Sequence, residues 1–86
     1  MSNKNYQKGA QREYRIVRKL REAGYHIVQR TAGSHSPFDV IAIDRTFKEI
    51  KLIQSKPKSL SENKKKELEK EHDWLNGIFK VDFYVI

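Results

Sequence analysis

Hydrophobic and polar positions along the chain follow two periods, one helical and one strand-like. From Ala10 to Leu20, core-facing positions recur at spacings of three and four, which predicts a helix over residues 8–23 that ends at Gly24. Segments rich in β-branched and aromatic residues follow, and a stretch rich in Gly, Ser and Pro interrupts them. The predicted strands cover residues 25–30, 38–44 and 47–54, with a loop over residues 31–37.

The last third of the chain predicts a second helix and a final strand. Either Ser59, paired with Glu62 in a capping box, or Ser61 caps the helix, which runs to about Leu75. Residues 81–86 are apolar enough for a buried strand. The crossover through the second helix sets this strand parallel to an earlier one. The order αβββαβ therefore predicts an α/β fold with a mixed four-stranded sheet flanked by two helices.

The composition limits the size and the setting of this fold. At 86 residues and 10.2 kDa the chain forms one domain, residues 1–86, with 1–7 expected to be a flexible arm. The chain has no cysteine, so neither a disulfide nor a thiolate-bound zinc supports its thin core, and we expect a homodimer. No segment indicates a membrane span or export, and we expect a cytoplasmic protein.

The positive charge is concentrated in the first third of the chain. Residues 1–30 carry eight basic and two acidic side chains, for a net +6 of the total +7. Residues 57–86 carry six of each, so the lysine-rich second helix is balanced by glutamates. A solvated surface tuned for solubility is one interpretation. The concentration of charge favours a nucleic acid as partner.

Three charged residues on the second and third strands suggest a catalytic site. Glu49 and Lys51 are two apart and share one strand face, and Asp39 begins the preceding strand. An ordinary cross-strand ion pair is the alternative explanation for Glu49 and Lys51. A two-residue turn would place Asp39 on the wrong face, whereas a three-residue loop over residues 44–46 sets Asp39 opposite Lys51 and diagonal to Glu49. The site therefore predicts an odd-numbered loop.

Such a cluster suits a divalent cation. Two nearby carboxylates repel by a few kcal/mol at an effective dielectric of about 20, so they need a cation between them or Lys51 beside them. Oxygen ligands favour Mg²⁺, with Mn²⁺ able to substitute, and such an ion supports hydrolysis of a phosphodiester. Glu13 adds a core-facing carboxylate on the basic first helix, or alternatively pairs with Arg12 or Lys19 at the surface.

These residues resemble the PD-(D/E)XK nuclease superfamily. The pattern is Asp39, nine residues, and then Glu49-Ile50-Lys51, after a helix that carries Glu13 and within the order αβββαβ. Residues 8–13, 24–25 and 30–34 leading to 39–42 are closely similar to archaeal-type Holliday junction resolvases. The resemblance covers residues 8–56 and implies a minimal restriction-endonuclease-like core.

The resemblance also implies an activity and a set of roles. It implies a dimeric, Mg²⁺-dependent endonuclease that nicks paired strands of a four-way DNA junction, as in recombination and repair. Asp39, Glu49 and the Ile50 carbonyl would bind the metal, Lys51 would be the catalytic lysine, and Glu13 would lie near the metal. Residues that would contact DNA are Lys8, Arg12, Arg15, Arg30 and Ser34.

Other functions stay open at the level of sequence. A small nuclease of the same superfamily acting on flaps, ends or duplex DNA is one, and a non-catalytic basic module that binds DNA or RNA is another. A small dimerising adaptor would leave the charge asymmetry unexplained. His26, His35 and His72 receive no role. The proline two residues before Asp39, at Pro37, departs from the superfamily pattern, as does the missing C-terminal extension that contributes to the resolvase dimer.

Overall fold

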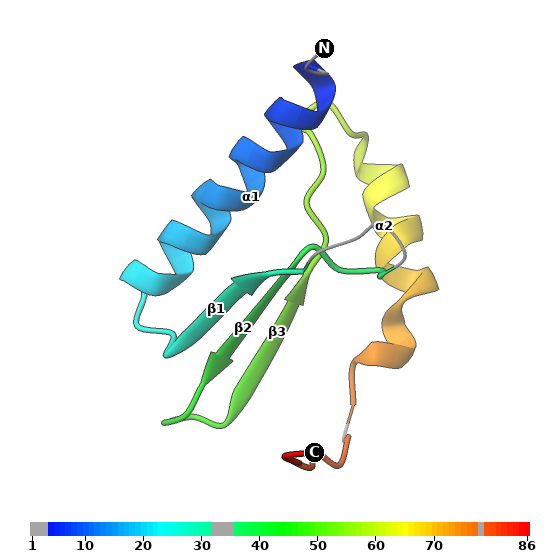
Figure 1. The fold of residues 1–86 in the computed structure, drawn as a ribbon. Helices are drawn as coiled ribbons and strands as arrows, with labels where there is room; N and C mark the ends of the chain where they lie inside the picture. The colour runs from blue at the N-terminus through cyan, green and yellow to red at the C-terminus, as the bar shows by residue number, and fades with distance from the viewer. Residues whose placement is uncertain (1–3, 32–35, 78) are drawn as a thin grey trace.

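A computed structural model of the chain describes residues 4–31, 36–77 and 79–86, and Figure 1 shows their arrangement. The described residues form a mixed α/β structure with two helices, a sheet and one short 3₁₀ turn. The elements are α1 (Lys4–Glu22), β1 (Ile27–Arg30), β2 (Val40–Asp44), β3 (Glu49–Ile53), α2 (Glu62–Glu71) and the 3₁₀ turn η1 (Asp73–Leu75).

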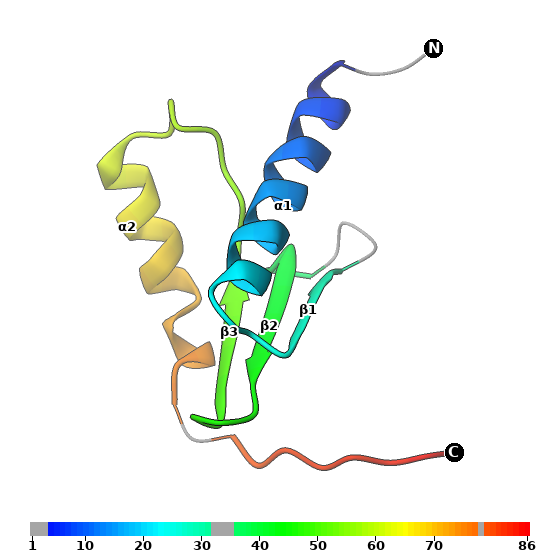
Figure 2. The same cartoon turned by 90° about the vertical axis from the view of Figure 1, so that its left-hand side faces the viewer.

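The sheet is three-stranded and antiparallel, in the order β1-β2-β3. Helix α1 packs against β1 and β2, whereas α2 packs against η1 and makes no close backbone approach to any strand. Figure 2 shows α1 in front of the sheet and α2 beyond the β3 edge. In the described part of the chain, one helix therefore packs on the sheet and the second helix does not.

The core lies between α1 and the sheet and is small. Val17 of α1 packs with Val28, Val40 and Ala42, and these four are the buried hydrophobic residues of the described chain. Around them pack four partly buried side chains, namely Ile16, Leu20, Tyr25 and Ile53. Burying a valine side chain stabilises a fold by about 1.5–3 kcal/mol, so this core is modest. The thin core expected from chain length is confirmed.

Helix α1 ends where the sequence predicts. Gly24 has φ of +102°, the Tyr25 N–H bonds the Leu20 carbonyl at 3.1 Å, and the Gly24 N–H bonds that of Arg21 at 3.1 Å. These two bonds form a Schellman motif, which requires a left-handed residue that glycine adopts without strain. The start was predicted wrongly, because helical backbone begins at Lys4 and includes four of the residues expected in a flexible arm.

Helix α2 begins at the second of the two predicted caps. The Ser61 hydroxyl accepts a hydrogen bond from the Lys64 N–H at 3.2 Å, so Ser61 is the N-cap and the Ser59–Glu62 capping box is wrong. The helix ends at Glu71, and the 3₁₀ turn η1 carries the chain to Leu75, the predicted end of the helix.

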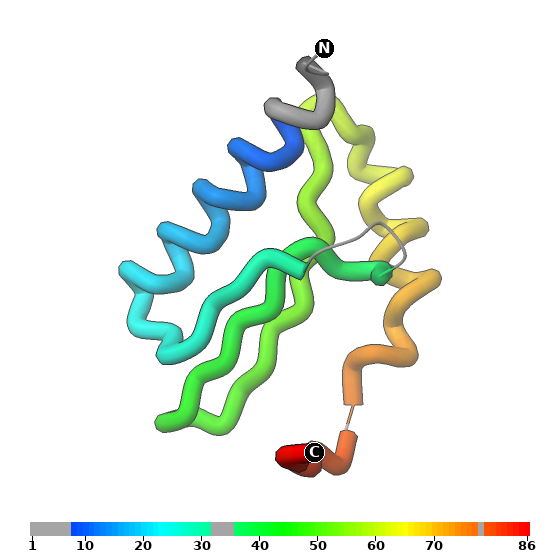
Figure 3. The backbone as a smooth tube through the Cα atoms, viewed as in Figure 1, coloured from blue at the N-terminus to red at the C-terminus, as the bar shows by residue number. Residues whose placement is uncertain are grey.

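The β2–β3 hairpin has a four-residue turn over residues 45–48, so both the odd-numbered loop and the two-residue alternative are wrong. Asp44 pairs with Glu49 across the turn, and its Oδ1 accepts hydrogen bonds from the Thr46 N–H at 2.9 Å and the Phe47 N–H at 3.4 Å. Lys48 closes the turn with φ of +54°, which costs a non-glycine residue some strain. Figure 3 traces this turn between the two strands.

The predicted fourth strand is not a strand in the described residues. Residues 81–86 have no regular secondary structure, and the sheet is antiparallel throughout instead of mixed. The apolar side chains of this segment are exposed, each by 70% or more.

Among the described residues, no helix combines the length and the apolar character that crossing a membrane requires.

Candidate functional site

Asp39 lies where the ends of β1, β2 and β3 meet. Its N–H bonds the Ile53 carbonyl at 2.7 Å, and its carbonyl accepts from the Thr31 N–H at 2.9 Å. Its carboxylate Oδ2 accepts from the Ser55 N–H at 2.8 Å. Backbone on both sides thus fixes this half-buried carboxylate beside the segment that follows β3. Its second oxygen, Oδ1, makes no hydrogen bond within the described residues, which leaves it able to accept another group.

The predicted meeting of Asp39 with Glu49 and Lys51 is wrong. Glu49 pairs with Asp44 at the turn end of the hairpin, and Lys51 pairs with Ala42. Asp39 bonds to Ile53 at the other end of β3. Four residues of strand at roughly 3.3 Å each place Glu49 about 13 Å further along β3. The four-residue turn shifts the register by three residues from the predicted pairing of Asp39 with Lys51, which accounts for the separation.

Glu49 and Lys51 belong instead to a network with Tyr25. The Tyr25 hydroxyl donates to Glu49 Oε1 at 2.5 Å, and Lys51 Nζ lies 3.6 Å from the same oxygen. Lys51 Nζ is also 5.4 Å from the centre of the Tyr25 ring. Tyr25 and then Glu49 raise the pKa of Lys51, so the ammonium stays charged. Because Tyr25 also packs on the core, the network ties β3 to the loop after α1.

We expect Tyr25→Phe to lower the free energy of unfolding by about 0.5–1.5 kcal/mol, the usual contribution of one hydrogen bond. The ring and its packing stay, so the loss reports the bond to Glu49. Tyr84→Phe is the matched control, because Tyr84 is 75% exposed and makes no hydrogen bond within the described residues. Urea denaturation measures both variants. Equal stability of the two would show that the Tyr25 bond does not hold β3.

Glu13 and Arg30 meet close to the Asp39 end of the sheet. Arg30 Nε donates to Glu13 Oε1 at 2.9 Å, and its guanidinium lies 4.4 Å from the centre of the Tyr14 ring. The hydrogen bond with Glu13 is the main cause that raises the pKa of Arg30. Arg30 pairs with Val40, the neighbour of Asp39, so this ion pair and the Asp39 carboxylate occupy the same end of the sheet. The core-facing position predicted for Glu13 is consistent with its half-buried state.

The sequence interpretation missed Gln54 and Lys56. Asp39 bonds to Ile53 and Ser55, so Gln54 lies between its two partners and Lys56 follows directly. The segment Gln54-Ser55-Lys56 repeats the spacing of Glu49-Ile50-Lys51 five residues later, with a carboxamide in place of the carboxylate. That repeat was the available signal. Choosing between the two segments required the length of the hairpin turn.

The other predicted site residues are partly placed. Lys8 and Arg15 are exposed on α1, and Arg12 is half-buried, with an Nε atom that finds no partner within the described residues. Ser34 and His35 lie outside the described residues. His26 Nδ1 accepts from the Arg45 N–H at 3.1 Å, and His72 Nδ1 lies 2.9 Å from the Leu68 carbonyl. Both described histidines thus take part in local structure.

The residues beside Asp39 offer oxygen donors of the kind that Mg²⁺ takes. They are the Asp39 carboxylate and, on the segment bonded to it, the Gln54 amide oxygen and the Ser55 carbonyl, with the Glu13 carboxylate at the same end of the sheet. Within the described residues, no three His, Cys, Asp or Glu side chains gather closely enough to hold a metal by themselves. Mg²⁺ is commonly held by one or two carboxylates together with waters and substrate phosphates, so this donor set fits such an ion.

Comparisons with protein-family models, curated protein sequences and solved structures gave no match to this chain. What the described residues show is a mixed α/β structure, with a three-stranded antiparallel sheet and two helices. The resemblance to the PD-(D/E)XK superfamily stays a prediction, carried by residues 8–56.

Proposed function

We propose that the protein is an Mg²⁺-dependent, structure-selective DNA endonuclease whose active site is built around Asp39. The observation that carries the proposal is a pair of hydrogen bonds, in which the Asp39 N–H donates to the Ile53 carbonyl and the Asp39 carboxylate accepts from the Ser55 N–H. They hold a carboxylate against a segment with the spacing of a metal ligand followed by a catalytic lysine, Gln54 and Lys56. The proposal gives Gln54 and Lys56 the roles that the sequence predicted for Glu49 and Lys51.

In this proposal each residue has a defined task. Asp39, the Gln54 amide oxygen and the Ser55 carbonyl hold the ion, and Glu13 supports it through a bound water. The ion, when bound, polarises the phosphodiester and lowers the pKa of the attacking water. Lys56 orients that water and stabilises negative charge on the phosphate oxygens. Its exposed side chain on the connector can reach a substrate without disturbing the core.

Arg30 would hold the phosphate of the substrate next to this site. Its guanidinium is fixed by Glu13 on one side and stacked on Tyr14 on the other. Such fixing lowers the entropy lost when a phosphate binds. Glu13 uses one oxygen for Arg30, so the same carboxylate links the phosphate contact to the metal site.

The exposed basic residues of α1 would bind the DNA backbone. Each phosphate contact made by a lysine or arginine adds about 0.9 to the slope of log K against log salt concentration. We expect the double variant Lys8→Ala with Arg15→Ala to lower that slope by up to about 1.8. Lys64→Ala with Lys66→Ala is the matched control on α2, where glutamates balance the lysines. Equal slopes for the two double variants in fluorescence anisotropy would contradict a DNA surface on α1.

The substrate is the part of the proposal that one experiment tests best. The wild-type protein is incubated with labelled four-way junction, flap, nicked and plain duplex DNA, in Mg²⁺ or in EDTA. Symmetric paired nicks confined to the junction, seen in Mg²⁺ alone, support a resolvase-like enzyme acting as a homodimer. Cutting of the simpler substrates assigns the other nuclease function, and absence of any cleavage overturns the proposal.

A non-catalytic nucleic-acid-binding module is the second candidate. Two observations favour it, namely a carboxamide at Gln54 where a second carboxylate would bind metal more strongly, and the absence of a three-acid cluster within the described residues. In that case Asp39 is structural, and its bond to the Ser55 N–H closes the end of the sheet. Binding of DNA without cleavage in Mg²⁺ or Mn²⁺ would decide for this function.

A further inference from the structure

The described sheet has two edges, and they are not equivalent. The Ile43 carbonyl accepts from the His26 N–H, so the peptide groups of Ile43 face β1. Peptide groups point alternately to the two sides of a strand, so those of Ala42 face β3 and bond its partner there, Lys51. The peptide groups of Ile50 and Leu52 therefore point outward from the β3 edge.

The β1 edge is partly capped by a side chain. Arg21 Nη2 donates to the Val28 carbonyl at 3.1 Å, which satisfies an outward-facing acceptor of β1. Within the described residues no comparable side-chain bond reaches the peptide groups of Ile50 or Leu52. An edge strand with open peptide groups is a template for pairing with another strand. The β3 edge is thus the better acceptor.

The chain also carries a strand-forming segment that pairs with nothing in the described structure. Residues 81–86 read Val-Asp-Phe-Tyr-Val-Ile, a composition enriched in β-strands. Tyr84 and Val85 are 75% and 87% exposed. An extended run of six residues spans about 20 Å, and the five residues of β3 span about 17 Å. The segment is therefore long enough to cover the whole β3 edge.

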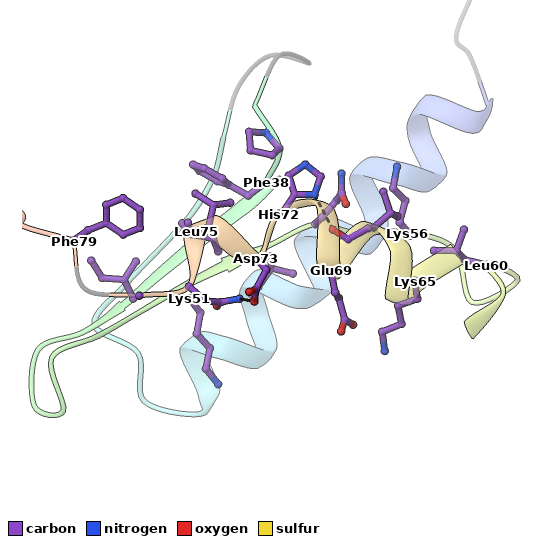
Figure 4. A pocket seen from close by; sticks show the side chains of 18 of the residues that line it. Phe38, Lys51, Lys56, Leu60, Lys65, Glu69, His72, Asp73, Leu75 and Phe79 are labelled. Carbon is purple, nitrogen blue, oxygen red and sulfur yellow. Dashed lines mark hydrogen bonds between the residues drawn. The ribbon is translucent and has the colours of Figure 1, made fainter. Parts of the chain in front are cut away.

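The surface beside the β3 edge combines apolar side chains with charged ones. A groove of about 1210 Å³ lies between this edge and α2, and Figure 4 shows side chains from both sides facing it. Water-exposed aliphatic side chains in such a groove favour an apolar occupant. The apolar residues that line it include Ile50, Leu52, Leu60, Leu68, Leu75 and Phe79.

The path of the segment points to a second molecule. Figure 2 shows residues 79–86 running away from α2, past the end of the sheet that carries the β2–β3 turn. The chain thus presents the segment outward while its own β3 edge stays open. Every copy carries both the strand and the edge, so an exchange between two copies closes with two-fold symmetry and leaves neither edge unused.

We propose that residues 81–86 of one copy pair with β3 of a second copy, and that this reciprocal exchange forms a homodimer. The partner's segment then lies along the β3 side of each groove, beside Ile50 and Leu52. The exchanged strand extends each sheet to four strands, the number that the sequence predicted. The dimer carries two Asp39 sites, but its formation does not depend on any activity of those sites.

Hydrogen exchange at a series of protein concentrations, with light scattering on the same samples, tests the proposal. We expect the amides of residues 81–86, Ile50 and Leu52 to become protected together as the dimer fraction rises. Protection that does not change with concentration would show that the segment pairs within its own chain and would overturn the proposal. A dimer with an unprotected segment, or no protection at any concentration, would overturn it as well.

A substitution at the acceptor edge adds a second readout. Leu52→Pro removes an outward N–H, and edge strands tolerate proline at such positions. Leu52→Ala is the matched control, because it shortens the same side chain and keeps the N–H. We expect dimerisation of the proline variant to be at least about tenfold weaker than that of the alanine variant. Proline has no N–H at position 52, so the hydrogen bond from this position to the partner's segment is lost and the strand pairing around it is weakened. Equal dimer affinities would contradict pairing at the β3 edge. Neither measurement uses DNA or metal, so its failure is separate from failure of the proposed nuclease function.

Discussion

Asp39→Ala should abolish Mg²⁺-dependent cleavage of DNA. A metal ion that binds the phosphate and the attacking water stabilises the transition state by several kcal/mol. Because each 1.4 kcal/mol is a factor of ten in rate, we expect the variant to lose about 1000-fold or more in cleavage rate. Affinity for DNA should be equal or higher, because a negative charge is removed from a surface that binds phosphate. Single-turnover cleavage and anisotropy titration measure the two quantities.

The structural role of Asp39 requires a control. Its Oδ2 accepts the Ser55 N–H, so the alanine variant also loses a bond that closes the end of the sheet. Asp39→Asn keeps an oxygen that can accept this bond and removes only the charge. We expect the asparagine variant to unfold like the wild type and still to lose cleavage. If both variants cut DNA at the wild-type rate, the nuclease proposal is wrong.

Lys56→Ala should lower cleavage far more than Lys51→Ala. Removing one group that stabilises transition-state charge typically costs about 100- to 1000-fold in rate, and in the proposed site that group is Lys56. Lys51, in the middle of β3, contacts Glu49 and the Tyr25 ring instead, so its loss should change the rate by less than about twofold.

Gln54 and Glu49 allow the same comparison for the proposed metal ligand. Gln54→Ala should weaken the response of the rate to Mg²⁺ concentration, whereas Glu49→Ala should alter stability alone. Rates measured over a range of Mg²⁺ concentration compare the two variants directly. A loss of cleavage in Glu49→Ala and Lys51→Ala, with Gln54→Ala and Lys56→Ala unaffected, would return the site to the residues predicted from sequence.

Local chemistry explains which parts of the fold the sequence predicts. The end of α1 depends on Gly24 and the backbone within one turn of it, and the cap of α2 depends on Ser61 and the N–H of Lys64. The three strands follow from short runs that are rich in β-branched residues. All of these are decided within a few residues of the element itself.

The site was harder to predict because it depends on register. The four-residue turn rests on two hydrogen bonds to the Asp44 carboxylate and on a left-handed Lys48, a conformation that lysine rarely adopts. A turn of another length moves each β3 residue to a different partner on β2, which decides whether Glu49 or Gln54 lies near Asp39. The prediction of a fourth strand was wrong for a related reason. Hydrophobic composition shows that residues 81–86 can form a strand, but it does not identify the strand with which they would pair.

The position of the metal is the central claim, and paramagnetic broadening by trace Mn²⁺ tests it most directly. Amide signals of the uniformly ¹⁵N-labelled protein are followed as the ion is added without DNA. The account predicts that the amides of Asp39, Gln54, Ser55 and Lys56 broaden first, and that Asp39→Asn removes the effect. Broadening that begins at Glu49 and Lys51, or that is spread evenly over the exposed carboxylates, would contradict a metal site at Asp39.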